Sequence, residues 1–370
     1  MTHINIRDLI QSLHDHPSSG YFSLAGGGVS GLSLLLSVPG ASRTVLGADI
    51  PYSEKALTDQ LGGLVAGACS EETAAAMAAY AFEKARDLTA APSSAPFGLS
   101  CTAALATDRT RQGQDRAYLA LQCAEGFYAR SLLFSKAFSR EEQESALGEA
   151  LLHFLASSLF ETAGPTQFSD VILESNDQSF QAPTTWQALI QCEIQKVESE
   201  SPVRALLPGA FNPIHQGHQD MAALAAERLG GPVHFELSIT NVDKPTLSYW
   251  HLQRRVEALR ACGPYVITRA PTFREKAALF PGTCFVVGAD TLARVDDDKY
   301  YASQNDRMEA IAAIAAQGCR FLVFGRMIDG QFQTLQALKV SDSLLALCEG
   351  IDEKAFRRDI TSSALRAEKD

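Results

Sequence analysis

The second half of the chain alternates short runs rich in apolar residues with longer stretches of helical hydrophobic spacing. The apolar runs stand at 203–207, 232–238, 284–287 and 320–324, and the helical patterns stand at 219–230 and 309–318. Short apolar runs between helices are typical of parallel strands that are buried on both faces. The pattern therefore predicts βαβ units, whose ligands bind at the carboxyl ends of the strands.

The first half mixes similar elements in a less regular order. We predict strands at 21–25, 44–46 and 117–121 and alanine-rich helices at 71–85 and 141–161, which is again an α/β pattern. A polar stretch, SNDQSFQAPTTWQ, then leads into a helical pattern, WQALIQCEIQKVE, which Thr184 or Thr185 could cap. We therefore predict an α/β domain at 1–165, a connector at 166–201 and a domain with a parallel sheet at 202–370.

The composition of the chain limits the kinds of molecule that it can bind and the environment in which we expect it. The 370 residues are 46% hydrophobic and carry a net charge of −11, which excludes a disordered chain and argues against nucleic acid as a partner. The chain has neither a signal-peptide pattern at its start nor an apolar run long enough to span a membrane, so we expect a soluble cytoplasmic protein without a membrane partner. The eight cysteines are scattered singly, and we expect buried free thiols rather than metal ligands or disulfides.

One string joins the strand at 203–207 to the helix behind it. It reads Pro208-Gly-Ala-Phe-Asn-Pro-Ile-His-Gln-Gly-His218. A helix amino-terminus presents unpaired N–H groups and a positive dipole, and Gly209 would let backbone amides approach a phosphate. His215 and His218 can donate hydrogen bonds to phosphate oxygens. A zinc site would need more ligands than this segment supplies, since only Asp220 stands nearby.

This string resembles the signature of the H-x-G-H nucleotidylyltransferases, and most closely that of nicotinate- or nicotinamide-mononucleotide adenylyltransferases. Ile360-Thr-Ser-Ser-Ala-Leu-Arg366 is similar to that family's I-S-S-T-x-I-R motif, and Phe285-Val-Val-Gly-Ala-Asp290 is similar to its G-x-D strand. The resemblance implies a Rossmann-like fold and catalytic roles for His215, His218, Lys244 and Arg366. It also implies nucleotide contacts from Gly209, Ala210, Phe211, Asn212, Gly288, Asp290, Thr361, Ser362 and Ser363, with Mg²⁺ carried by ATP and no metal ligands from the protein.

The chain departs from this family at the acceptor site. The tryptophan that stacks on the mononucleotide in the family is absent, and Asp296-Asp-Asp-Lys-Tyr-Tyr301 stands in its place. Tyr300 or Tyr301 could stack on a pyridine ring, although three adjacent aspartates are unusual neighbours for a phosphorylated substrate. The identity of the acceptor is therefore open.

Residues 13–161 resemble the carboxy-terminal domain of CinA, a family with amidase activity toward nicotinamide mononucleotide. The strings LAGGGVSG and CSEETAAAM carry this resemblance. Gly27 stands where the active family has its nucleophilic serine, Leu57 where it has a lysine, and the T-G-I-A-G-P loop is replaced at 102–107. Because amide hydrolysis needs an activated nucleophile, we expect a catalytically degenerate domain. The literal G-x-G-x-x-G at 26–31 could instead mark a dinucleotide site, but Pro39-Gly40 leaves little room for the crossover helix.

We therefore expect an enzyme that transfers the adenylyl group of ATP to a small phosphorylated acceptor, a pyridine mononucleotide, in NAD biosynthesis or salvage. A nucleotidylyltransferase with another phosphorylated acceptor, a non-catalytic nucleotide-binding regulator and a bifunctional amidase are the alternatives. The amino-terminal domain could also hold copies of the chain together as a homo-oligomer.

Overall fold

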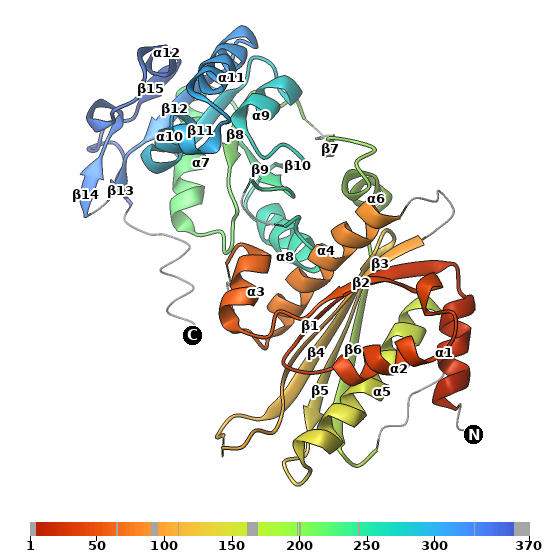
Figure 1. Ribbon diagram of the computed structural model, residues 1–370. Helices are drawn as coiled ribbons and strands as arrows, with labels where there is room; N and C mark the ends of the chain where they lie inside the picture. Colours follow the sequence, from red (N-terminus) through yellow and green to blue (C-terminus); the bar gives the residue numbers. More distant parts are fainter. Residues whose placement is uncertain are drawn as a thin grey trace. The chain divides into compact units, whose positions relative to one another are not determined.

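The computed structural model describes residues 5–63, 66–89, 95–109, 111–160, 169–197, 199, 201–242, 245–328 and 330–358. The chain forms two compact units. The first contains residues 1–187 together with 243–252, and the second contains residues 188–242 and 253–370. Each unit has its own sheet with helices around it, which confirms the α/β class (Figure 1).

The first unit is built on a six-stranded mixed sheet with the order β2-β1-β3-β4-β5-β6. β1 pairs in parallel with β2 and β3, and the remaining pairs are antiparallel. Residues within the predicted connector thus form β6 of this sheet, where Ile172 packs into the core. The strands are β1 (Ser18–Ala25), β2 (Val45–Asp49), β3 (Ala95–Ala104), β4 (Asp115–Cys123), β5 (Gly126–Phe134) and β6 (Ile172–Gln181).

Helices cover both faces of this sheet (Figure 1). α4 lies on one face, and it approaches β3 so closely that a Cβ at Gly98 would lie 2.0 Å from the Phe82 nitrogen. α1, α2 and α5 enclose the main core on the other face. The elements are α1 (Ile6–Asp15), α2 (Val29–Ser37), the 3-10 helix η1 (Ala41–Arg43), α3 (Glu54–Leu61), α4 (Glu71–Leu88), α5 (Arg140–Leu159) and α6 (Thr184–Ile190).

The second unit contains a seven-stranded sheet with the order β15-β12-β11-β8-β9-β10-β7. Its strands are parallel except β7, which pairs antiparallel with β10. The predicted parallel sheet is confirmed. Its strands are β7 (Lys196–Val197), β8 (Ala205–Pro208), β9 (His234–Ser238), β10 (Tyr265–Thr268), β11 (Cys284–Gly288), β12 (Arg320–Phe324) and β15 (Cys348–Gly350), and β13 (Arg326–Ile328) and β14 (Gln331–Gln333) form a separate hairpin.

The strand order reverses direction at β8. The chain runs from β8 to β9 and β10 on one side, and then returns to place β11 on the other side of β8. The loops after β8 and β11 therefore diverge at a topological switch point, where α/β sheets bind ligands. The helices are α7 (Gln216–Leu229), α8 (Tyr249–Arg260), α9 (Phe273–Leu279), α10 (Ala289–Val295), α11 (Gln304–Ala316) and α12 (Asp342–Leu345), with 3-10 helices η2 (Asp298–Tyr300) and η3 (Leu335–Ala337).

Two helices begin or end at other residues than the sequence predicted. The helical pattern starting at Trp186 gives only the end of α6, because the chain turns at Cys192, whose φ is +66°, and continues into β7. α7 begins at Gln216, earlier than the apolar spacing indicated, so His218 lies in its first turn.

The cysteines are free thiols among the described residues, and Cys192 is exposed, contrary to the expected burial. No helix in the described parts of the chain is both long and apolar enough to cross a membrane.

Candidate functional site

A cleft opens at the switch point of the second unit. It has a volume of about 900 Å³ including the space open to solvent. The loops that follow β8, β11 and β12 all contribute to its wall. Its lining consists of Leu207, Pro208, Gly209, His215, His218, Met221, Val286, Val287, Gly288, Asp290, Thr291, Arg326, Met327 and Arg358.

An aromatic ring packs against the loop that follows β8. Phe211 is 2% exposed, has a φ of +46°, and makes edge contacts with Phe235 and His218 at centroid distances of 5.5 and 5.2 Å. A Cβ at Gly209 would lie 2.7 Å from the Phe211 ring, so this close packing requires glycine. Phe211 therefore supports the loop. Among the predicted nucleotide contacts in this loop, Gly209 lines the cleft, and Ala210, Phe211 and Asn212 lie outside its lining.

The two histidines of the motif stack on each other at the start of α7. Their ring centroids are 3.8 Å apart, with an interplanar angle of 28°. The His215 backbone N–H donates to Nδ1 of His218 over 3.3 Å. A ring nitrogen that accepts a hydrogen bond carries no proton, so neutral His218 has its proton on Nε2. Nδ1 of His215 is buried and has no hydrogen-bond partner within the described protein. Both histidines line the cleft.

The surroundings of both imidazoles disfavour their protonated forms. Burial, followed by the neighbouring His215 imidazole and the charge of Arg326, lowers the pKa of His218 to about 3. Burial and Arg326 also lower the pKa of His215. An anion in the cleft would oppose these effects, because a nearby opposite charge favours the protonated form.

Asp290 and Arg326 meet across the cleft from two neighbouring strands. Asp290 lies in the first turn of α10 behind β11, and Arg326 follows β12. A Cβ at Gly288 would lie 2.5 Å from Asp290 Oδ1 and 2.9 Å from Arg326 Nε. Glycine at 288 therefore leaves the space that this carboxylate and this guanidinium occupy in the wall of the cleft.

Arg326 and Arg358 are cleft residues that our sequence reasoning did not identify. Arg358 donates from Nε to Asp220 over 2.7 Å, and Asp220 also accepts from Gln216 over 2.8 Å. Asp220 is thus hydrogen-bonded to an arginine and an amide. Within the described ranges, no group of three or more His, Cys, Asp or Glu side chains could hold a metal ion.

Lys244, Arg366, Thr361, Ser362 and Ser363 lie outside the described residues. The predicted roles of these residues therefore remain predictions.

The acidic run after α10 has internal partners. Asp296 accepts hydrogen bonds from Arg307 and from Ser341, and Asp298 accepts one from Arg307 over 2.7 Å. Tyr301 donates its hydroxyl to the Val295 carbonyl over 2.8 Å. Neither Tyr300 nor Tyr301 is among the residues that line the cleft. The aspartates thus hold local structure together, and their charge is partly compensated.

In the first unit, the glycine-rich loop is closed by a side chain of the protein itself. The Glu144 carboxylate accepts from the backbone N–H groups of Gly28 and Ser30 over 3.1 and 3.0 Å. A Cβ at Gly27 would lie 3.0 Å from Leu147 Cδ2 and 3.1 Å from Glu144 Oε2. The amides that could bind an anion at the start of α2 therefore bind Glu144.

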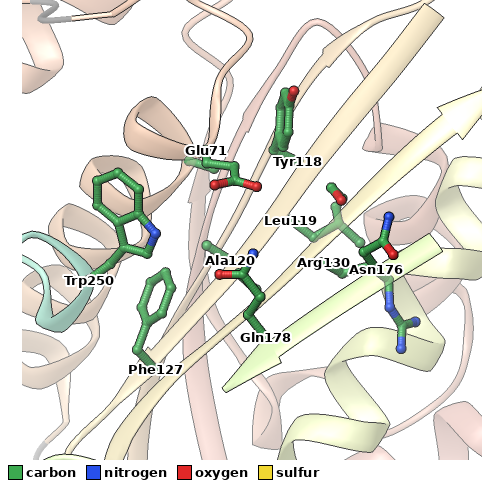
Figure 2. Close-up of a pocket in the computed structure, with 12 residues that line it drawn as sticks. Glu71, Tyr118, Leu119, Ala120, Phe127, Arg130, Asn176, Gln178 and Trp250 are labelled. Carbon is green, nitrogen blue, oxygen red and sulfur yellow. The ribbon is translucent and has the colours of Figure 1, made fainter. Parts of the chain in front are cut away.

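A shallow hollow lies elsewhere in the first unit, on the sheet face beside the start of α4. Figure 2 shows Trp250, Phe127 and Glu71 near one another on one side, with Asn176 and Gln178 projecting from β6. Its volume is about 270 Å³ including open space, and it is separate from the glycine-rich loop.

Comparison with known families gives one match. Residues 206–367 match the model of the cytidylyltransferase-like family. We refer to the matched residues as the cytidylyltransferase-like domain, after the family that they resemble. The match includes the H-x-G-H string, the cleft and the predicted 360–366 motif, and it confirms the resemblance to nucleotidylyltransferases. The cytidylyltransferase-like domain therefore supports nucleotidyl transfer as the general activity.

Several solved structures are similar to the chain. The competence/damage inducible protein CihA from Agrobacterium tumefaciens is 20% identical and covers 42% of this chain and 98% of its own, with a TM-score of 0.34. CinA superfamily proteins from Escherichia coli and Enterobacter cloacae are each 16% identical, with TM-scores of 0.33 and 0.32. They cover 43% and 44% of this chain and 92% and 97% of their own. CinA is the family that the motifs of the first half resemble. A comparison with curated proteins finds no match.

Proposed function

We propose that the cytidylyltransferase-like domain transfers the adenylyl group of ATP to nicotinamide or nicotinate mononucleotide and releases pyrophosphate, as a step of NAD biosynthesis or salvage. The observation that carries this proposal is the stacked pair His215 and His218 at the start of α7, inside a cleft at the switch point. A triphosphate there would meet the helix amino-terminus, two imidazoles and Arg326. The carboxylate of Asp290 suits the two hydroxyls of a ribose.

The reaction needs no covalent enzyme intermediate. An oxygen of the acceptor phosphate attacks the α-phosphorus of ATP in line and forms the new P–O bond. The bond between the α-phosphorus and the oxygen that bridges to the β-phosphorus breaks, and that oxygen leaves with pyrophosphate. Positioning and stabilisation of the developing negative charge supply most of the catalysis in such transfers. Nε2–H of His218 and the guanidinium of Arg326 would donate to that charge. Lys244 and Arg366 would add positive charge, and Thr361, Ser362 and Ser363 would hold the triphosphate.

Mg²⁺ would arrive with ATP. Among the described lining residues of the cleft, Asp290 is the carboxylate, and one carboxylate fits a metal held mainly by phosphate oxygens and water. The magnesium ion would neutralise part of the triphosphate charge.

We propose that the first unit has no amidase activity. Gly27 supplies no nucleophile, and the Ser30 hydroxyl donates to the Glu144 carbonyl over 2.7 Å. The Glu144 carboxylate also accepts hydrogen bonds from two backbone amides of this loop. A serine nucleophile needs a base to accept its proton. The Glu144 backbone carbonyl, which accepts the hydrogen bond of Ser30, is not a base of this kind.

Pyrophosphate release tests the reaction. The protein is incubated with ATP or CTP, together with nicotinamide mononucleotide, nicotinate mononucleotide, phosphopantetheine, glycerol phosphate or a flavin precursor. We expect release with ATP and a pyridine mononucleotide. Release with CTP or with another acceptor would replace the proposed substrates, and ATP binding without release in any mixture would favour a regulatory protein. Ammonia release from nicotinamide mononucleotide would contradict the inactive first unit.

A further inference from the structure

Two ion pairs of the second unit join α7 to the chain that contains β15 and the residues after it. Glu349 of β15 accepts hydrogen bonds from Nε and Nη2 of Arg228, in the last turn of α7, over 2.8 and 2.6 Å. Further along the chain, Arg358 donates from Nε to Asp220, near the start of α7, over 2.7 Å. The two pairs are similar in chemistry, but Arg358 lines the cleft and Arg228 is not among its described lining residues.

The guanidinium of Arg358 is held in place by three contacts. Its Nε donates to Asp220, its Nη1 donates to the Arg357 carbonyl over 3.1 Å, and its Cζ lies 6.0 Å from the centre of the Phe356 ring. Phe356 is buried and packs edge-on against Phe324 of β12 at a centroid distance of 4.9 Å. Within the described part of the chain, these hydrogen bonds use two of the five N–H donors of a guanidinium. The other donors remain for a ligand.

Arg358 lies close to His215 at the start of α7. A Cβ at Gly217 would lie 3.1 Å from the His215 ring and 3.9 Å from Cβ of Arg358, so both residues border the first turn of the helix. His215 is 8% exposed, and its Nδ1 has no hydrogen-bond partner among the described residues. The first N–H groups of a helix also lack partners within the helix, and they attract an anion. A helix amino-terminus, an unpaired ring nitrogen and a guanidinium therefore meet at one edge of the cleft.

The charges of the described cleft lining favour an anion. Arg326 and Arg358 contribute two positive charges, and Asp290 contributes one negative charge. The whole chain has a net charge of −11, so this positive wall is a local feature. The side chains of Arg358 and Asp220 are 50% and 24% exposed, and exposed ion pairs contribute little to stability. The pair therefore adds little to folding, whereas a guanidinium that is already held in position adds affinity for a phosphate.

We propose that Arg358 binds phosphate oxygens of the nucleotide at the start of α7, and that Asp220 is a positioning residue that holds this guanidinium toward them. The inference rests on the proposed function, which places a nucleoside triphosphate in the cleft. A planar guanidinium donates two parallel hydrogen bonds to one phosphate, and a lysine ammonium at the same place does not.

Calorimetry on the full chain, with inorganic tripolyphosphate and with ATP as ligands, tests the contact. Arg358→Ala removes the guanidinium, and Arg228→Ala is the matched control because it removes the other arginine pair between α7 and the same chain segment. We expect the Kd for both ligands to rise about tenfold in Arg358→Ala and to stay within about twofold in Arg228→Ala. Arg358→Lys keeps the charge without the planar fork, and its Kd should lie between those of wild type and Arg358→Ala.

The two ligands distinguish failure of this inference from failure of the proposed function. Equal affinity of wild type and Arg358→Ala would overturn the phosphate contact, as would an equal loss in Arg228→Ala, which would indicate a general effect of releasing the chain from α7. Tripolyphosphate has neither base nor ribose. If its binding depends on Arg358 while no acceptor yields pyrophosphate from ATP, the proposed function is refuted and the phosphate contact stands. If wild type binds ATP alone, the Kd for ATP decides in the same way. Wild type that binds neither ligand would overturn both.

Variants of Asp220 separate positioning from a simple effect of charge. If Asp220 acted only through its negative charge, Asp220→Ala would lower the Kd for tripolyphosphate, because a carboxylate repels an anion. If Asp220 positions Arg358, the Kd should rise about threefold in Asp220→Ala and stay within about twofold of wild type in Asp220→Asn, which keeps an acceptor oxygen for Nε of Arg358. In the double variant with Arg358→Ala, Asp220→Ala should raise the Kd no further. A lower Kd in Asp220→Ala, or a further rise in the double variant, would contradict the positioning role.

Discussion

Replacing His218 by asparagine should change how the stability of the second unit depends on pH. Asn keeps a polar side chain of similar size and cannot be protonated in this range. The folded protein holds the pKa of His218 at about 3 instead of the ordinary 6.5, chiefly through burial. Below about pH 6.5 the unfolded chain therefore binds a proton at this position, and the folded chain does not. Stability contributed by neutral His218 is present above that pH and is lost as the pH falls toward 3.

The size of the effect follows from linkage. Each pH unit within that window corresponds to about 1.4 kcal/mol, so wild type should lose about 2 kcal/mol between about pH 8 and pH 5 through this one group. His218→Asn should lose none of it. Urea unfolding followed by far-UV circular dichroism at both pH values measures the difference between variant and wild type. A difference that stays constant with pH, or an imidazole NMR titration of His218 with a midpoint near 6.5, would refute the reasoning.

Further predictions concern two glycine-containing loops, one in each unit, and a buried ion pair of the second unit. Gly288→Ala should raise the Kd for ATP about tenfold, because the new Cβ displaces Asp290 or Arg326. The control Gly231→Ala, whose Cβ meets no atom within 4 Å, should leave this Kd unchanged. Calorimetry measures the Kd of both variants. Glu144→Ala leaves two loop amides without their acceptor and should destabilise the first unit by about 1–3 kcal/mol, measured by tryptophan fluorescence in urea; an effect no larger than that of any exposed glutamate would contradict the closed loop. Lys276→Met leaves Glu236 charged and buried and should cost about 3–5 kcal/mol in urea unfolding; a cost below about 1 kcal/mol would contradict a buried ion pair.

Much of the candidate site followed from local sequence. His215, His218 and Asp290 could be placed because the string with the two histidines and the segment with Asp290 each follow an apolar run, and parallel strands bring such segments to one edge of a sheet. Arg326 carries the same signal, since it follows the run at 320–324, but the strand order that puts β12 next to β11 depends on distant pairing. Arg358 lies beyond the last strand and has no comparable local pattern.

The roles of other residues depended on contacts that no spacing reveals. Asp296 and Asp298 appeared unfavourable as a charged run, whereas Arg307 on α11 binds both carboxylates. Glu144 lies far along the chain from Gly28 and Ser30, whose backbone amides donate to its carboxylate. The contacts of Tyr249 likewise join segments that are distant in sequence. Its side chain is fully buried, and its hydroxyl donates to the Ala124 carbonyl.

The fate of the three phosphates of ATP tests the central claim most directly. ATP radiolabelled at either the α- or the γ-phosphorus is incubated with the protein, Mg²⁺ and nicotinamide or nicotinate mononucleotide, and the products are separated by chromatography. We predict that the α-label enters a dinucleotide, that the γ-label leaves as pyrophosphate, and that His218→Ala reduces both by orders of magnitude while its circular dichroism matches wild type. Release of the γ-label as inorganic phosphate, or no dinucleotide with either acceptor, would contradict adenylyl transfer to a pyridine mononucleotide.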